Sequence, residues 1–517
     1  MALSDYINKV SKVIKRDDIR GSWRENIDSD FAYNLGLVLA DIFADHTAVE
    51  PVNVVVGHDM RVSGPILAQA LCTGLEHGGC RSIAMGRAGT ELVGFIPAKY
   101  SDVIDGGVMI TASHNRKDDN GFKFYGRGAM PLPMAAEMTP PDPEDPVQRI
   151  ALGMKKRCIP TELKWEEFAP DYILTAIERG GLDFAKAAAG AKRPLRIAVE
   201  AGNGMGGLII GEFAKLTPQF EWTFSHEMPD GSFPIIIPNP LQAEYQKMVR
   251  DLVLGSKSDV GVCFDGDADR VAIFDETGRI ITPAQLAAQV GLMLRKKLGP
   301  GAKIAFNLAS SWVVPDTLGN REEVLGGSAA LMTPVGYGKI KPIMHEDTTI
   351  AFGAEHSGHY MFREFWCADS GMLAGLLMLE LAAGLQAQGK TLSSTLEEPR
   401  RKYCESGEIN FQLPANRPGD EVIARAAKEL SKELRRLYVV VEDHCRLVDS
   451  YPPKGLNLSV SDLRAEADNW WFCMRKSGTE AGAGDLLRLY VEADRDQALM
   501  EEKRDALVKL VGPELRV

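Results

Sequence analysis

The 517-residue chain lacks the features that mark disulfide-rich and membrane-spanning proteins. Its eight cysteines include no CxxC pair, and a chain of this length can bury its cores without covalent cross-links, so we expect reduced thiols. The first 20 residues contain no apolar run of the kind found in a secretory signal. The longest apolar stretch, 371–387, is short for a membrane span and contains Glu380, which favours a buried helix. We therefore expect a cytoplasmic protein that has no membrane partner.

Positive charge is also in short supply. The chain has 59 lysine and arginine residues against 71 aspartate and glutamate residues, which gives a formal net charge of −12. Nucleic acids and anionic membranes repel such a chain, so neither is expected as a main partner. A negatively charged small molecule would need a local basic pocket. The hydrophobic fraction of 45% is that of an ordinary globular protein.

The chain is long enough for about three or four domains, each with its own core. Apolar, β-branched runs alternate with helical patterns, and three of these runs lead into loops rich in glycine or serine: 52–57, 195–199 and 303–306. This alternation predicts mostly parallel sheets that are covered by helices on both faces.

Proline marks two interruptions of this pattern. Residues 131–146 contain six prolines and predict a surface loop. A second break is expected near Pro399. The segment from about residue 401 then predicts a separate α+β unit, which ends in a strand at 486–491 and a charged helix.

The stretch Thr111–Asn115 carries a strong chemical signal. It follows the apolar run 107–110, which predicts a buried strand, so Ser113 is expected in a loop at the end of that strand. Serine hydroxyls are poor nucleophiles at neutral pH and need a base or a polarised phosphoryl group. His114 follows directly, and Lys123 lies close in sequence. Ser113 is therefore a candidate phosphate carrier, although an isolated serine at such a position more often caps a helix or a turn.

A second loop, 265–270, supplies three carboxylates at alternate positions, from Asp265, Asp267 and Asp269. It lies between two apolar runs, which argues against a solvated acidic turn. The carboxylates can converge on one hard cation. Mg²⁺ prefers oxygen ligands and is commonly bound by carboxylate and phosphate oxygens together. A phosphate-carrying serine and a magnesium loop together indicate phosphoryl transfer.

Two alternatives remain for the acidic loop. Its spacing also fits an EF-hand calcium loop, with Glu276 at the twelfth position. However, Arg270 stands where that loop requires glycine, and the flanking runs predict strands. An aspartyl phosphatase also places Asp-x-Asp after an apolar strand, but that interpretation gives Ser113 no role.

A rival signal belongs to another class of enzyme. Gly202, Gly204 and Gly207 satisfy GxGxxG after a predicted strand and before an apolar helix. Glu227 lies at about the right distance for a ribose contact, so the motif would indicate an NAD-dependent oxidoreductase. A lone GxGxxG is a weak signal, and nothing else in the sequence is suited to hydride transfer.

Two further loops carry polar groups suited to a sugar phosphate. In 353–359, Glu355, Ser357 and His359 offer groups that bind sugar hydroxyls and move protons, although such a loop alone is often an ordinary polar turn. In 475–480, Arg475 and backbone N–H groups could bind a phosphate dianion. A solvated basic turn is the alternative for that loop.

Taken in order, these loops resemble those of one known family, the α-D-phosphohexomutases. The resemblance runs nearly end to end, through DIRG at 18–21, VGHDMRVSG at 56–64, TASHN and NGFK around Ser113, EAGNG at 200–204, PDGSFP at 229–234, DGDADR, GAEHSGH and RKSGTE. DIRG, NGFK and SGEIN at 406–410 are most similar to the phosphomannomutase/phosphoglucomutase branch. AGNG is a common scaffold element in this family, which weakens the oxidoreductase interpretation.

The resemblance implies an α/β fold. It has three α/β domains with mixed, mostly parallel sheets and a smaller, mobile C-terminal α+β domain, arranged around a central cleft. We expect a phosphoserine domain at 1–160, a metal-loop domain at 161–282, a sugar-recognition domain at 283–400 and a phosphate-binding domain at 401–517.

The resemblance also implies a role for each matching residue. Ser113 would be the phosphoserine, and its oxygen would bind Mg²⁺ together with Asp265, Asp267 and Asp269. The transferred phosphate would be surrounded by Arg20, His114, Lys123 and Arg270. Glu355 and Ser357 would read sugar hydroxyls, and His359 would transfer a proton. The non-reacting phosphate would be bound by Arg475, Ser477, Gly478 and Thr479.

The implied reaction is reversible phosphoryl transfer between the 1- and 6-positions of mannose phosphate, glucose phosphate or both. It passes through a hexose 1,6-bisphosphate, which also serves as activator, so small sugar phosphates are the expected partners. Phosphoglucosamine mutase is the alternative within the family. Aspartyl phosphatase and NAD-dependent oxidoreductase are the alternatives from other classes. Arg116, where the family usually has proline, and the unusual stretch 452–468 leave the sugar preference open.

Overall fold

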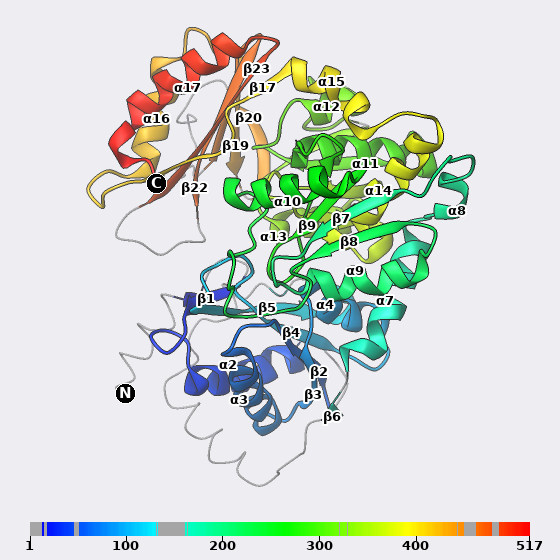
Figure 1. Cartoon of the computed structure of the whole chain (residues 1–517). Coiled ribbons are helices and arrows are strands. Elements are labelled where there is room, and N and C mark those ends of the chain that lie inside the picture. Colours follow the sequence, from blue (N-terminus) through cyan, green and yellow to red (C-terminus); the bar gives the residue numbers. More distant parts are fainter. Residues whose placement is uncertain are drawn as a thin grey trace. The chain divides into compact units, whose positions relative to one another are not determined.

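The computed structural model describes residues 13–14, 18–45, 51–130, 132, 161–162, 164–319, 321–327, 329–441, 443–448, 462–477 and 485–517. These residues form a mixed α/β structure with several sheets (Figure 1). The chain divides into two compact units, which are described separately. Unit 1 comprises Met1–Thr282 and Gly358–Leu392, and unit 2 comprises Pro283–Ser357 and Ser393–Val517. The expected loop at 131–146 lies outside the described residues, apart from Leu132.

The first sheet of unit 1 has the strand order β1-β5-β4-β2-β3-β6. Its strands are β1 (Ile19–Ser22), β2 (Asn53–His58), β3 (Arg81–Arg87), β4 (Gly106–Ile110), β5 (Asp119–Gly126) and β6 (Thr161–Glu162). β5 runs antiparallel to both of its neighbours, and the other pairs are parallel. β4 is the buried strand predicted from the apolar run 107–110, and the serine loop follows its carboxyl end.

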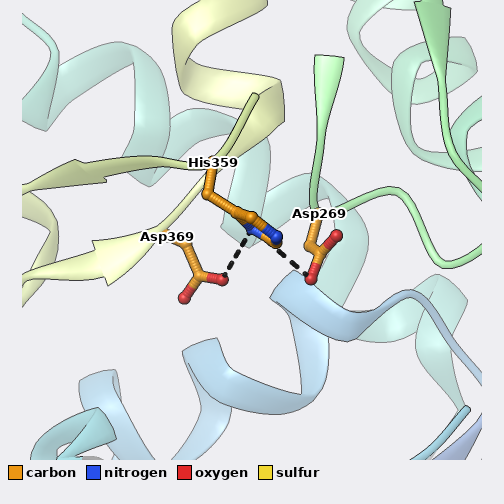
Figure 2. A group of neighbouring side chains, drawn as sticks. All are labelled: Asp269, His359 and Asp369. Atoms are coloured by element: carbon orange, nitrogen blue, oxygen red, sulfur yellow. Dashed lines mark ion pairs between the residues drawn. The ribbon is translucent and has the colours of Figure 1, made fainter. Parts of the chain in front are cut away.

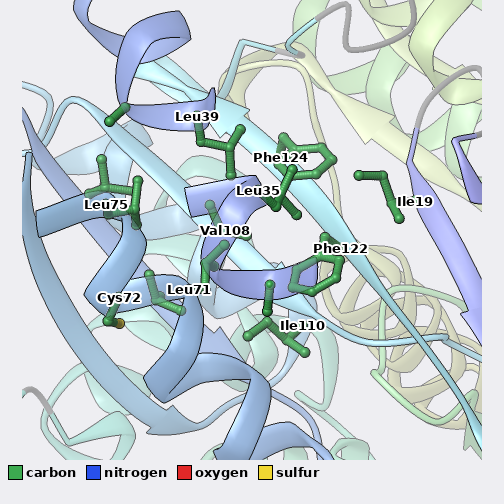
Figure 3. Packing of buried hydrophobic residues seen from close by; sticks show 14 of the residues in the cluster. Ile19, Leu35, Leu39, Leu71, Cys72, Leu75, Val108, Ile110, Phe122 and Phe124 are labelled. Carbon is green, nitrogen blue, oxygen red and sulfur yellow. The ribbon is translucent and has the colours of Figure 1, made fainter. Parts of the chain in front are cut away.

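Helices α2 (Ser29–Asp45) and α3 (Gly64–His77) pack against each other and against this sheet. The buried residues of α2 recur at intervals of three and four, as in an amphipathic helix. Figure 3 shows Leu35 and Leu71 of these helices near Val108 of β4. Helix α4 (Thr90–Lys99) contacts β2 and β4 as well. This core holds in place the strand that leads to the serine loop.

The second sheet of unit 1 has the strand order β11-β10-β9-β7-β8. Its strands are β7 (Arg196–Glu200), β8 (Glu221–Ser225), β9 (Val260–Phe264), β10 (Val271–Asp275) and β11 (Ile280–Ile281). β7, β8 and β9 are parallel, whereas β9 and β10 form an antiparallel hairpin. Both hairpin strands were predicted from the apolar runs, and the acidic loop is the turn between them.

Unit 1 also contains several helices and one further strand pair. The helices are α7 (Trp165–Arg179), α8 (Phe184–Ala187), α9 (Gly206–Leu216), α10 (Ala243–Ser256) and α14 (Gly371–Ala387). β15 (Tyr360–Phe362) and β16 (Ala368–Asp369) pair antiparallel. α14 has the bounds of the expected buried helix, and Ser370 Oγ caps it by accepting from Leu373 N at 2.9 Å.

Unit 2 contains a parallel group of strands in the order β13 (Ala330–Thr333), β12 (Lys303–Asn307) and β14 (Ile350–Ala354). α11 (Pro283–Leu298) precedes these strands in the sequence, and α15 (Leu392–Lys402) follows them. α12 (Val313–Leu318) connects β12 to β13, and α13 (Tyr337–Glu346) connects β13 to β14. α15 continues through Pro399 to Lys402 and the next strand begins at Tyr403, so the break expected near Pro399 falls between Lys402 and Tyr403.

An antiparallel sheet completes unit 2, with the order β17-β23-β22-β21-β19-β20 and with β18 also paired to β23. Its strands are β17 (Tyr403–Glu405), β18 (Ile409–Gln412), β19 (Arg436–Val441), β20 (His444–Val448), β21 (Asp462–Glu466), β22 (Trp470–Ser477) and β23 (Leu486–Asp494). Helices α16 (Gly419–Glu429) and α17 (Gln497–Val511) lie against one face of this sheet (Figure 1). This is the α+β unit predicted after residue 401.

Two global expectations can be compared with these elements. Within the described ranges, no single helix has the length and apolar character to cross a bilayer. α14 and α15 meet these criteria only as a pair, and the chain bends by 109° between them. The seven cysteines that the structure describes are free thiols, as predicted.

Candidate active site

Ser113 lies in unit 1 with its hydroxyl between an anion and a cation. Its Oγ donates to Asp265 Oδ2 at 2.7 Å and accepts from Arg270 Nη2 at 2.7 Å. His114 Nδ1 lies 3.1 Å from the same oxygen. The serine has a φ of 53°, in the left-handed region that costs a non-glycine residue roughly 1–2 kcal/mol. The loop is therefore held in this shape by contacts elsewhere.

Arg61 supplies those contacts. Its two terminal nitrogens donate to four main-chain carbonyls, those of Ser113, Asn115, Arg116 and Asp119. Its Nε donates to Asp59 Oδ2 at 3.1 Å, and both side chains of this pair are buried. In the sequence, this segment stands out only as part of the family motif at 56–64. The sequence signal for this role was the pair Asp59 and Arg61, which directly follows the apolar strand β2.

The three aspartates of the acidic loop converge as predicted. Their ligand atoms lie within 4.8 Å of one another, and all three side chains are buried. Lys123 Nζ donates to Asp267 Oδ2 at 2.7 Å and also to Asp269 Oδ2. Thr90 Oγ1 donates to Asp267 Oδ2, a contact that was not predicted from the sequence. The site thus joins the acidic hairpin to β5 and to the start of α4.

The residues present fit a hard divalent cation. Asp267 Oδ1 and Asp269 Oδ1 are buried, and in the described part of the chain neither has a hydrogen-bond partner. Burial alone would raise the pKa of Asp267, but Lys123 and Thr90 hold it well below its usual range. Burial raises the pKa of Asp265, against the opposing effect of Arg270. Two unsatisfied carboxylate oxygens beside a third carboxylate are the donor set that Mg²⁺ prefers.

His359 lies beside the acidic loop, between two carboxylates (Figure 2). Its Nδ1 is 3.9 Å from Asp269 Oδ2 and 3.6 Å from Asp369 Oδ2. Burial alone would lower the pKa of His359, but Asp269 and Asp369 raise it above the ordinary value. Asp369 was not identified from the sequence, since it follows the GAEHSGH motif by ten residues and stands on a short strand of its own.

Arg20 and His114, both predicted to surround the transferred phosphate, lie at the edge of this cluster. Arg20 Nη1 donates to Asn115 Oδ1 at 3.3 Å, and its Nε donates to Asp18 Oδ2 at 2.7 Å. Burial lowers the pKa of His114 well below its ordinary value, and Arg270 and Arg20 lower it further. His114 is therefore a neutral imidazole, while Arg270 beside it remains charged.

Unit 2 carries the remaining predicted residues. Glu355 Oε1 accepts from Gly336 N at 2.6 Å and from Asn307 Nδ2 at 3.2 Å. Arg475, on β22, lies with Nη2 at 3.6 Å from Glu408 Oε2. Ser357, in the same loop as Glu355, is half-buried. Ser477 is the last described residue of β22 and its side chain is outside the description, as are Gly478 and Thr479 altogether.

The GxGxxG segment does not form an open nucleotide-binding turn. Its backbone donors are used within the protein: Gly202 N to Glu200 Oε1, Asn203 N to His226 O, Gly204 N to Ala201 O and Met205 N to Gly266 O. A Cβ at Gly207 would lie 2.5 Å from the carbonyl of Glu227. The glycines therefore allow close packing beside the acidic loop, and the N–H groups from Gly202 to Met205 are already bonded within the protein. The oxidoreductase alternative therefore loses support.

The chain matches the three models of the phosphoglucomutase/phosphomannomutase α/β/α domains, domain I at residues 11–139, domain II at 172–278 and domain III at 282–403. It is 32% identical over 508 residues to a phosphomannomutase of Vibrio cholerae, covering 96% of this chain and 97% of that protein.

Solved structures share the fold. A phosphoglucomutase/phosphomannomutase family protein of Burkholderia thailandensis superposes with a TM-score of 0.73 at 24% identity, over 98% of each chain. An Aspergillus fumigatus N-acetylphosphoglucosamine mutase, solved in complex with GlcNAc-6P and magnesium, has a TM-score of 0.52 at 15% identity, over 92% of this chain and 85% of that one. The chain belongs to the phosphoglucomutase/phosphomannomutase family and is a phosphohexomutase, an isomerase that transfers a phosphoryl group reversibly between hexose 1-phosphate and hexose 6-phosphate.

Proposed function

We propose that this chain is a phosphomannomutase/phosphoglucomutase that carries the transferred phosphoryl group on Ser113. The observation that supports this most is the position of Ser113 Oγ, at 2.7 Å from both Asp265 Oδ2 and Arg270 Nη2. An oxygen placed there can bear a phosphoryl group whose charge is balanced by Arg270 and Lys123. Arg20 and the neutral His114 complete the proposed surroundings of the phosphoryl group.

Mg²⁺ is the proposed metal, held by Asp265, Asp267, Asp269 and an oxygen on Ser113. When bound, it would polarise the phosphoryl group and neutralise developing charge. The magnesium in the Aspergillus relative is consistent with this assignment. A hexose 1,6-bisphosphate is the proposed activator, because it can phosphorylate Ser113 when the serine has lost its phosphate.

The transfer itself involves this chain's residues as follows. A free hydroxyl of the bound hexose phosphate attacks the phosphoserine, a new P–O bond to the sugar forms, and the P–O bond to Ser113 breaks. The electron pair remains on Ser113 Oγ, where Arg270 stabilises it, and the hydroxyl proton passes to His359. The bisphosphate then turns, Ser113 Oγ attacks its other phosphoryl group, and the freed sugar oxygen takes the proton back from His359.

Substrate recognition is proposed for residues of unit 2. Glu355 and Ser357 would bind sugar hydroxyls. Glu355 is suited to this because, within the described ranges, its Oε1 accepts two hydrogen bonds and no donor reaches its Oε2. Arg475, with Ser477, Gly478 and Thr479, would bind the phosphate that is not being transferred. Mannose or glucose phosphate is the proposed substrate, with glucosamine phosphate as the alternative.

We also propose the four domains at 1–160, 161–282, 283–400 and 401–517. The first two sheets fall within the first two ranges, except that β6 at 161–162 pairs with β3. A cytoplasmic location stays a prediction.

A coupled assay tests the proposed function. Purified protein is supplied with glucose 1-phosphate, mannose 1-phosphate or glucosamine 1-phosphate, each with a trace of glucose 1,6-bisphosphate, and formation of the 6-phosphate is followed. We expect turnover of glucose and mannose phosphates to exceed that of glucosamine phosphate. Preference for glucosamine phosphate would support the alternative mutase, and release of inorganic phosphate without isomerisation would contradict the mutase proposal.

A further inference from the structure

Asn307, the last residue of β12, binds two neighbouring residues of the sugar-recognition loop. Its Nδ2 donates to Glu355 Oε1 at 3.2 Å and approaches His356 Nδ1 at 3.0 Å. Its Oδ1 accepts from Ser310 Oγ at 3.0 Å. Asn307 is fully buried, and its amide oxygen and both amide hydrogens are engaged. The orientation of this amide is therefore fixed.

The contact with Asn307 sets the tautomer of His356. Because the amide donates to Nδ1, that nitrogen is the acceptor, and in the neutral ring the hydrogen sits on Nε2. His356 Nε2 lies 3.2 Å from Glu408 Oε2, to which it donates. The imidazole thus bridges a buried amide of one strand and a carboxylate that follows β17.

Glu408 is a shared anion within unit 2. Arg488 Nη1 donates to its Oε1 at 2.7 Å, and Arg475 Nη2 lies 3.6 Å from its Oε2. Burial alone would raise the pKa of Glu408, but His356 and the two arginines hold it well below the usual range, so the carboxylate stays charged. Its Oε2 is the point at which the histidine and Arg475 meet, since Arg475 Nη2 is also 3.5 Å from His356 Nε2.

We propose that Asn307, His356 and Glu408 are positioning residues that couple the sugar-binding Glu355 to the phosphate-binding Arg475. The proposal rests on the proposed function, which gives Glu355 and Arg475 their roles. Asn307 fixes both Glu355 and His356, and His356 and Arg475 share one oxygen of Glu408. A displacement of Glu355 by the sugar ring is therefore transmitted to Arg475, and the two recognition events are not independent.

The separation between Arg475 and Glu408 suits this role. At 3.6 Å the pair is electrostatic and is not a close two-point hydrogen bond, so the guanidinium keeps donors for a phosphate. Glu408 still prevents Arg475 from turning away. A purely structural ion-pair cluster would stabilise unit 2, but it would give no coupling between ring recognition and phosphate recognition.

Double-mutant cycles measure this coupling. The cycle combines Glu355→Gln with Arg475→Lys, and kcat and KM are measured for mannose 1-phosphate and glucose 1-phosphate. The same cycle is repeated in His356→Ala and His356→Gln backgrounds. Glutamine can still donate to Glu408, whereas alanine cannot.

In the parent background, we expect the combined loss in kcat/KM to differ at least about threefold from the product of the single losses. In the His356→Ala background, the losses should multiply within error, and His356→Gln should restore part of the coupling. The proposal would be overturned if the coupling persisted unchanged in the His356→Ala background, or if the parent protein showed no coupling.

Glu408→Gln provides a second test that does not depend on the histidine variants. We expect KM to rise at least about fivefold for both sugar phosphates, with a smaller fall in kcat, because the reacting groups are untouched. The matched control is Glu433→Gln, which removes the ion pair of the exposed Glu433 with Lys503 at 2.9 Å and should leave KM unchanged. Equal behaviour of the two variants would overturn the proposal.

Failure of the proposed function is distinguishable from these outcomes. If the parent protein shows no mutase turnover, the proposed function is wrong. In that case, calorimetric binding of mannose 1-phosphate to the same variants still reports the coupling. Binding with no difference between the parent and Glu408→Gln would then overturn the positioning role by itself.

Discussion

Arg61 Nη2 donates to the main-chain carbonyl of Ser113 at 2.8 Å, so a buried guanidinium fixes the residue that carries the proposed chemistry. The same nitrogen also binds the carbonyl of Asn115 at 3.0 Å. The left-handed conformation of Ser113 persists because these bonds determine the path of the loop.

Arg61→Lys tests this relationship. Arg61 makes five side-chain hydrogen bonds in all, and a lysine ammonium has only three donors, so at least two bonds are lost. At roughly 1 kcal/mol for each bond, we expect a destabilisation of about 2 kcal/mol or more in urea unfolding, and a fall in kcat. Arg196→Lys, at a partly exposed side chain 3.9 Å from the exposed Glu221, is the control and should change neither quantity. A stable Arg61→Lys variant with normal kcat would contradict the role of this arginine.

Asp267→Asn tests the metal site. The change removes one ligand charge of three and leaves Lys123 and Thr90 with a neutral partner. We expect weaker Mg²⁺ affinity, measured by calorimetry, and loss of most activity. The exposed Asp251→Asn is the control and should behave like the parent. Full parent activity in excess EDTA would refute the metal assignment.

Glu91 should make stability depend on pH. This buried carboxyl accepts from Ser370 Oγ at 2.6 Å, from Met372 N at 3.0 Å and from the Tyr172 hydroxyl. Burial raises its pKa to about 8, above the ordinary value of 4.5, so the folded state binds a proton that the unfolded state has released. The stability from this group is complete below the unfolded pKa and is lost as pH rises toward 8.

The comparison is between the parent and Glu91→Gln, which mimics the protonated form. Urea unfolding between pH 5 and 8 should show the parent losing stability relative to the variant, by at most about 1.4 kcal/mol for each pH unit. Parallel stability curves across this range would show that Glu91 does not carry the raised pKa.

Local patterns predicted the strands that carry the chemistry. The apolar runs before Ser113 and on both sides of the acidic loop correspond to β4, β9 and β10, because continuous apolar β-branched segments favour buried strands. The alternate spacing of the aspartates was enough to predict that they converge, since the hairpin turn is short.

Other site residues could not be identified in this way, because their roles depend on contacts between distant segments. Thr90 reaches Asp267 across 177 residues, and Arg61 reaches Ser113 across 52. Asn307 ends an ordinary apolar strand, and only the folded chain brings its amide to Glu355. No periodicity or spacing in one sequence reports such contacts.

Phosphorylation of Ser113 is the most direct test of the account. Protein incubated with glucose 1,6-bisphosphate is digested, and the peptide that contains Ser113 is analysed by mass spectrometry, alongside Ser113→Ala and the control Ser101→Ala. We predict one phosphate on Ser113 in the parent and in Ser101→Ala, and loss of both the phosphate and mutase turnover in Ser113→Ala. An unmodified Ser113 peptide in a protein with mutase turnover, or near-normal turnover by Ser113→Ala, would show that Ser113 does not carry the transferred phosphoryl group.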